Sequence, residues 1–215
     1  PDGWNGTFDD VAGVRRLDTV AIRATTIAAA GVVDLQVLDS TLEGCAMTTG
    51  PHDVVDIVAS VLTECDLSRV RIGRLRGSKL TGCKLVGTDF AQAELQDVEL
   101  DACTLTYANF RMAELTRVAF RASRLDDVDF YEASLHHCST DGCDLQHVNV
   151  DRAAFDTVDL RGTRTLGLTG LGGLDGCLLG HAQLQQLAYD LALAMGASIE
   201  RDDPSTDPSD HSTPK

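Results

Sequence analysis

Residues 136–147, HHCSTDGCDLQH, bring the side chains that most often bind transition metals into one short stretch. They are His136, His137, Cys138, Cys143 and His147. Imidazole nitrogens and thiolate sulfurs are the ligands of structural zinc sites, where they must converge on one ion. Whether these side chains can converge depends on the backbone elements that hold them.

No arrangement typical of catalysis accompanies this cluster. The sequence contains no GxSxG, no P-loop, no HExxH and no GxGxxG after a strand. The glycines at 167 to 176 lack the Lys and the Ser or Thr of a phosphate-binding loop. We therefore expect a protein that is not an enzyme and that has no cofactor.

Charge and composition exclude further classes. The chain carries 33 Asp and Glu against 18 Lys and Arg, a net charge of −15, which argues against direct binding of nucleic acid. It has neither an apolar run of membrane-spanning length nor the pattern of a signal peptide. Seven cysteines without a CxxC pair favour free thiols, so we expect a cytoplasmic protein.

Large apolar residues recur every five positions, a period that fits neither a strand nor an α-helix. A small residue stands two positions before each of them, for example Cys83 before Leu85 and Ala93 before Leu95. The N-terminal half follows the same rule in a shifted frame, and the frame changes at residues 72–75, IGRL. The unbroken series in the second half is Leu75, Leu80, Leu85, Phe90, Leu95, Leu100, Leu105, Phe110, Leu115, Phe120, Leu125, Phe130 and Leu135.

A turn in every pentad explains this period. Residues two apart on a strand share a face, so the small and the large residue both point inward, and four right-angle turns close a square coil of 20 residues. Successive coils stack as parallel strands about 4.8 Å apart. We therefore predict one solenoid over residues 15–165, in seven to eight coils, with Phe90, Phe110 and Phe130 stacked inside and a turn two residues short at 72–75.

This geometry decides against the metal site. Cys138 and Cys143 occupy the small inward position, whereas His136, His137 and His147 occupy outward positions. Ligands on opposite sides of one wall cannot converge on one ion, so we expect no bound metal. The inward cysteines are interpreted as small hydrophobic residues, because side chains in one column point in parallel and do not favour disulfides.

The repeats resemble those of the pentapeptide-repeat family, whose motif is A(D/N)Lxx. AELQD (93–97), ANFRM (108–112) and AELTR (113–117) match it fully. The resemblance implies an all-β solenoid, a right-handed quadrilateral β-helix. It also implies kinship with acidic members that bind DNA gyrase or topoisomerase IV, imitate duplex DNA and protect the enzyme from quinolones.

The ends of the chain depart from the repeat. Residues 1–14 are interpreted as a lead-in, and residues 166–200 as a Gly-rich connection followed by a capping α-helix over 181–195. The acidic tail 201–215, rich in Pro, Ser and Asp, is expected to be disordered. Gyrase-protecting relatives dimerise through a similar C-terminal segment, so the resemblance implies a homodimer joined by this helix. Its apolar face holds Leu184, Leu187, Leu191 and Met195.

One segment breaks the columns. In residues 47–56, MTTGPHDVVD, His52 stands where a large apolar residue belongs. Gly50, Pro51, His52 and Asp53 are candidates for a small loop that leaves the wall and carries recognition. The alternative interpretation is a repeat that has decayed without a role.

Two functions remain open for a non-catalytic interaction module. The first is a DNA-mimicking partner of gyrase, and the second is a structural scaffold for an unknown protein partner. One acidic stripe would favour the first, and an even charge distribution would favour the second. The acids expected to face a partner are Asp89, Glu94, Glu99, Glu114, Asp129, Asp144 and Asp159.

Overall fold

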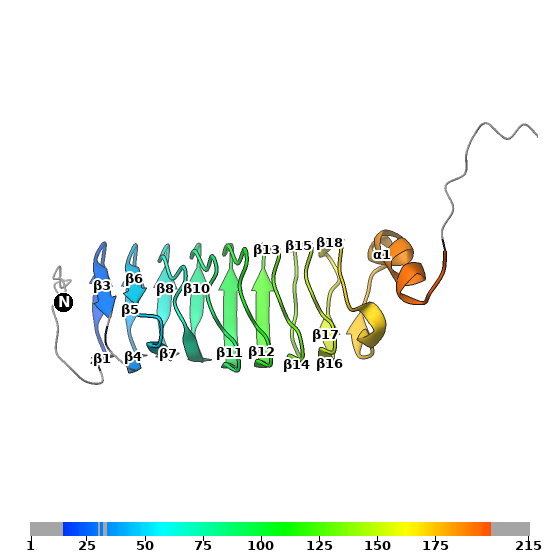
Figure 1. The fold of residues 1–215 in the computed structure, drawn as a ribbon. Helices are drawn as coiled ribbons and strands as arrows, with labels where there is room; N and C mark the ends of the chain where they lie inside the picture. The colour runs from blue at the N-terminus through cyan, green and yellow to red at the C-terminus, as the bar shows by residue number, and fades with distance from the viewer. Residues whose placement is uncertain (1–14, 30, 32–33, 199–215) are drawn as a thin grey trace, which may run out of the picture.

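The computed structural model describes residues 15–29, 31 and 34–198. They form a β-solenoid of about 8 turns, followed by a single α-helix at its C-terminal end (Figure 1). The predicted lead-in 1–14 and tail 201–215 lie outside the described residues. Within the described part of the chain, no helix is long and apolar enough to cross a membrane.

The solenoid has four faces, which we number in chain order within each coil. The first face consists of β1 (Arg15–Asp18), β4 (Asp34–Leu38), β7 (Val54–Val58), β9 (Ile72–Arg76), β11 (Glu94–Asp101), β12 (Glu114–Arg121), β14 (Ser134–His136) and β16 (Ala154–Asp156). β11 and β12 continue around the corner onto the second face, where they pair in register over both faces.

The other three faces are built from shorter pieces. The second face adds β2 (Ala21–Arg23), β5 (Thr41–Glu43), β8 (Val61–Thr63), β10 (Lys79–Thr81), β17 (Val158–Asp159) and β19 (Cys177–Leu178). The third face holds β3 (Thr26–Ala29), β6 (Ala46–Thr49), β13 (Arg124–Asp126), β15 (Asp144–Gln146) and β18 (Arg164–Leu166). The fourth face is joined by single bridges that connect Arg71, Asp89, Asn109, Asp129, Asn149 and Thr169.

Strand register confirms the coil length and the frame shift. All strand pairs are parallel, and in the second half partners such as Glu94 and Glu114 are 20 residues apart. Between β8 and β10 the separation is 18, since Val61 pairs with Lys79. The register shifts between β7 and β9, as predicted for residues 72–75.

Most corners turn at a single residue with a left-handed backbone. In one coil these residues are Asp97 (φ 56°), Ala102 (φ 52°), Tyr107 (φ 60°) and Met112 (φ 56°). This conformation is unfavourable for residues with a Cβ, by roughly 1–2 kcal/mol. The next coil offsets the strain, because the corner N–H of Ala102 donates to the carbonyl of Arg121 at 2.9 Å, and Tyr107 and Met112 make the equivalent bonds to Asp126 and Tyr131.

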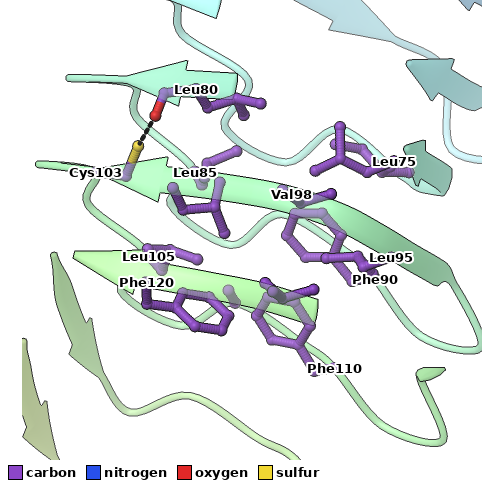
Figure 2. Close-up of a cluster of buried hydrophobic side chains, with 14 of the residues drawn as sticks. Leu75, Leu80, Leu85, Phe90, Leu95, Val98, Cys103, Leu105, Phe110 and Phe120 are labelled. Atoms are coloured by element: carbon purple, nitrogen blue, oxygen red, sulfur yellow. Dashed lines mark hydrogen bonds between the residues drawn. The ribbon is translucent and has the colours of Figure 1, made fainter. Parts of the chain in front are cut away.

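The core is a stack of layers, one in each coil. The rings of Phe90 and Phe110 stack with centroids 4.4 Å apart, and those of Phe110 and Phe130 with centroids 4.8 Å apart, which confirms the predicted column. Phe120 reaches across from the second face and meets Phe110 edge-on at 6.3 Å (Figure 2). Within the wall, the thiol of Cys103 donates to the carbonyl of Leu80 at 3.5 Å (Figure 2).

The C-terminal end of the rod is covered by the Gly-rich segment, the 3-10 turn Leu171–Gly173 and helix α1 (His181–Ala194). Strand pairing continues past residue 165, because β17 pairs with β19. Helix α1 buries Gln183 and Leu187 against the last coil. The Gln183 amide donates to the carbonyls of Leu160 and Thr163 and accepts from the N–H of Gly180, so this side chain ties the start of α1 to the backbone of the last coil.

Candidate functional site

The His and Cys residues of 136–147 lie on opposite sides of the wall, as the repeat geometry predicts. Cys138 and Cys143 are buried, whereas His136, His137 and His147 are at least partly exposed. His136 and His147 instead lie beside carboxylates of neighbouring coils, at 3.4 Å from Asp156 and 3.8 Å from Asp127. Among the described residues, no three His, Cys, Asp or Glu side chains are grouped to hold a metal ion.

The cysteines are free thiols whose pKa is raised, except at Cys103, where the hydrogen bond with Cys83 lowers the pKa. All seven are free, and six of them are buried. Burial raises the pKa of the Cys143 thiol to about 11, and burial likewise raises the pKa of Cys177 to about 11. A thiol that stays protonated at neutral pH is neither a good nucleophile nor a ready metal ligand.

The segment Gly50–Asp53 forms a tight turn within the coil. Only four residues separate the end of β6 at Thr49 from the start of β7 at Val54. The Asp53 carboxylate is buried and accepts from the N–H groups of Gly50 (2.5 Å) and Gly31 (3.0 Å). Pro51 and His52 remain exposed at the turn. Where the repeat is interrupted, the buried side chain is thus a hydrogen-bonded carboxylate, that of Asp53, and not an apolar side chain.

The acids expected to face a partner do not form one stripe. All seven are at least partly exposed, but they are divided among the four faces. Glu94 and Glu114 lie on the first face, Glu99 and Asp159 on the second, Asp144 on the third, and Asp89 and Asp129 on the fourth.

Most of these acids are also paired with a basic side chain. Lys79 Nζ lies 2.9 Å from Glu99, Arg111 lies 2.9 Å from Asp129, and Arg161 lies 2.7 Å from Asp159. Longer contacts join Arg74 to Glu94, Arg164 to Asp144 and Arg71 to Asp89. Among the described residues, Glu114 is the one member of the set without an ion pair. Pairing of this kind contributes little stability at a surface, but it cancels charge locally.

Basic partners in neighbouring coils shift the pKa of the carboxyl groups that they contact. The hydrogen bond from Arg117 lowers the pKa of Asp97, and that from Lys79 lowers the pKa of Glu99. Burial acts in the opposite direction at Asp56 and Asp126 and raises the pKa of each.

We expect acidification to destabilise the protein through Asp97, whose pKa is lowered in the folded state. A carboxyl whose folded pKa is depressed contributes stability above its unfolded pKa and loses it as pH falls through the folded value. Thermal melts between pH 5 and pH 2 should therefore show a falling midpoint, and Asp97→Asn should make the fall shallower. Asp56→Asn is the control of opposite sign, because its raised pKa lets the folded state gain stability on protonation. A steeper fall in Asp97→Asn would contradict the assignment.

Two family models match the sequence. The description "Pentapeptide repeat region" matches residues 72–130, and "Pentapeptide repeats (8 copies)" matches residues 123–162. Residues 72–162 thus belong to the pentapeptide-repeat family. This family is generally structural or engaged in interactions rather than catalytic.

Solved structures similar to this pentapeptide-repeat protein include two whose functions are stated. One is HetL from the cyanobacterium Nostoc sp. strain PCC 7120, involved in heterocyst differentiation regulation, with 16% identity, a TM-score of 0.36 and coverage of 78% of this chain and 90% of HetL. Another is QnrB1, a plasmid-mediated fluoroquinolone resistance protein, with 14% identity, a TM-score of 0.34 and coverage of 83% and 99%. No curated protein matches the sequence significantly.

The helix residues of this pentapeptide-repeat protein divide into two groups. Leu187 is fully buried against the last coil, and Leu191 is partly buried there. Leu184 is 49% exposed and Met195 is 86% exposed. The three leucines and one methionine predicted to share one face therefore differ in burial, and only part of the set packs on the last coil. Large apolar side chains that remain exposed in or next to α1 are Leu184, Tyr189, Leu193 and Met195. Tyr189 and Leu193 lie one turn apart on the same side of the helix, and we call these two residues the helix patch.

Two features escaped the sequence analysis. The buried amide of Gln183 was not recognised as the group that closes the end of the solenoid, and no sequence pattern marks it. The ion pairs between coils could have been found, because Arg117 and Asp97 stand 20 residues apart, as do Arg152 and Glu132. Once the coil length is known, oppositely charged residues at this spacing indicate pairs.

Proposed function

We propose that the protein is a non-catalytic scaffold that binds a protein partner through the outer faces of its solenoid. The observation that carries this proposal is the distribution of charge, since the outward acids occupy all four faces and most are paired with Arg or Lys. A mimic of duplex DNA needs a continuous run of unpaired negative charge. The surface described above is mixed, which suits contacts with proteins.

The density of charge supports the same choice. Residues 15–165 hold 23 acidic and 16 basic side chains. Over a rod of roughly 36 Å, duplex DNA carries about 21 negative charges, at one per 1.7 Å. The net charge of this part of the chain is about one third of that, and ion pairs between coils reduce its local effect further.

Protection of DNA gyrase against quinolones is the second candidate. It is favoured by the overall charge of −15 and by the exposed helix patch, which offers a route to a two-fold assembly. The family resemblance implies it, whereas the paired charges weigh against it.

A supercoiling assay with purified gyrase and relaxed plasmid separates the two candidates. The scaffold proposal expects supercoiling, and its inhibition by a quinolone, to stay unchanged over micromolar additions of the protein. Relief of quinolone inhibition, or direct inhibition of gyrase, would overturn the scaffold proposal in favour of the second candidate.

A matched variant makes a negative result informative. Arg74→Glu on the first face combined with Arg117→Glu at its corner removes two positive charges next to Glu94, Asp97 and Glu114. Both arginine side chains are about half exposed, so the fold should survive, and circular dichroism checks this. If charge pairing is what separates this protein from a DNA mimic, the double variant should affect gyrase where the parent does not.

We further propose that the chain forms a homodimer through the helix patch. Leu193 is 46% exposed and Tyr189 is 58% exposed, so two large apolar side chains one turn apart on α1 face solvent. A two-fold interface would bury the same patch on both chains.

Light scattering tests the dimer. The intact protein at micromolar concentration should have twice the mass of the chain, and Leu193→Glu should return it to the monomer, because a charge would be buried at the interface. Val61→Glu is the control, since Val61 is similarly exposed (44%) but lies on the second face far from α1. A monomeric parent, or loss of the dimer in Val61→Glu alone, would contradict the assignment.

A further inference from the structure

The interior of the solenoid is incompletely filled near its C-terminal end. On the fourth face, the column of stacked phenylalanines ends at Phe130 and continues with the smaller Val150. On the second face, which lies opposite, Phe120 is followed by Thr140. Phe110 and Phe120 meet edge-on in the middle of the rod, so the loss of both rings in later coils removes packing from the same place.

The result is a cavity of about 30 Å³. Val150, Val158 and Leu160 line it from the walls of the last coils, and Leu168 and Leu174 close it from the Gly-rich segment. These side chains are buried or partly buried in the core, and the cavity surface they provide is entirely apolar.

Water is a poor occupant for this space. Its volume would admit a water molecule, but a buried water needs two to four polar partners. The nearest candidate partner is the hydroxyl of Thr140, which is already hydrogen-bonded to the hydroxyl of Thr163 at 2.7 Å. The thiol of Cys138, which also lines the cavity, donates to backbone carbonyls in the wall.

We infer that this cavity is a binding site for a very small apolar ligand that has no hydrogen-bonding groups. Apolar cavities that stay dry bind apolar ligands, and a cavity of about 150 Å³ accepts benzene. The present cavity has about one fifth of that volume, so an aromatic ring is excluded. Its ligand class is a diatomic molecule or a single large atom, and dioxygen is a suitable probe.

Paramagnetic relaxation of methyl groups under dissolved dioxygen tests the site on the full chain. The methyl groups of Val150, Val158 and Leu160 should relax faster and in a saturable manner. The methyl groups of Leu80 and Leu95, buried in filled layers of the same core, serve as internal controls and should change little. Uniform relaxation of all buried methyl groups would overturn the proposal, because it would indicate general diffusion into the core.

Two filling variants complete the test. Val150→Phe restores the ring that the column lacks, and Thr140→Leu fills the space from the opposite face. Each should abolish the selective relaxation, and Thr116→Val on the outer surface should leave it intact. If one filled variant fails to fold, the other still decides. Selective relaxation that persists in a folded filled variant would overturn the site. Binding of benzene by the parent would overturn the stated size class.

Discussion

Phe110→Ala should lower the free energy of unfolding by about 3–5 kcal/mol, the range for removing a buried phenylalanine. Phe110 is fully buried and stacks on Phe90 on one side and Phe130 on the other. It also meets the ring of Phe120 edge-on. The wall cannot close around the space, because each strand is fixed by backbone hydrogen bonds to the coils above and below.

The loss should extend beyond a single coil. The stability of a repeat protein is approximately the sum of its repeats and of the interfaces between neighbours, and Phe110 belongs to two such interfaces. Denaturant unfolding followed by circular dichroism measures the total effect. Hydrogen exchange should show the largest loss of protection in the coils that contain Phe90, Phe110 and Phe130.

Tyr107→Ala is the matched control for this change. Tyr107 stands three residues earlier in the same coil, but its side chain is 64% exposed. Its removal should cost far less, since little apolar surface is lost from the core. Equal destabilisation by the two substitutions would contradict the assignment of Phe110 to the structural centre of the rod.

The fold could be predicted from the sequence because one period determines almost everything. A large residue every five positions requires a corner in every pentad, and four corners fix the length of the coil. The stacking of Phe90 on Phe110 then follows from their spacing of 20, and the short turn at residues 72–75 follows from the shift of frame. The pattern within one coil also determines the contacts between coils, because each residue contacts its equivalent in the next coil.

The surface could be predicted only in part. Outward positions are known from the period, so the exposure of Glu94 and Asp129 was expected. Whether the acids form a stripe depends on which face each one occupies and on the basic residues one coil away. Arg111 reaches Asp129 over a separation of 18 rather than 20, which a side chain of this length can do but a column cannot predict.

The end of the rod could not be derived from the repeat. The period is lost after residue 165, and a hydrophobic pattern alone does not tell which side of a helix is covered. Leu187 and Leu184 are equivalent in the sequence pattern, yet Leu187 is buried and Leu184 is half exposed. The difference arises because the helix docks through Gln183, a polar residue that no amphipathic pattern would place inside.

Gln183→Leu should release helix α1 from the last coil and make it the least protected part of the protein. Gln183 is 4% exposed, and its amide accepts from the N–H of Gly180 and donates to the carbonyls of Leu160 and Thr163. Leucine has a similar volume but no polar atoms, so all three backbone groups would be left without this partner. An unsatisfied buried polar group costs about 1–3 kcal/mol, and the helix has few other buried contacts to offset the loss.

Hydrogen exchange should therefore show faster exchange at residues 158–194 in Gln183→Leu, while the coils around Phe110 keep the protection of the parent. Gln186→Leu is the matched control, because Gln186 lies one turn along the same helix but faces solvent. It adds the same apolar side chain without removing a buried hydrogen bond, so protection of the last coil should be unchanged. If Gln183→Leu were protected as well as the parent, apolar packing of Leu187 alone would hold the helix, and the amide would not be the group that closes the solenoid.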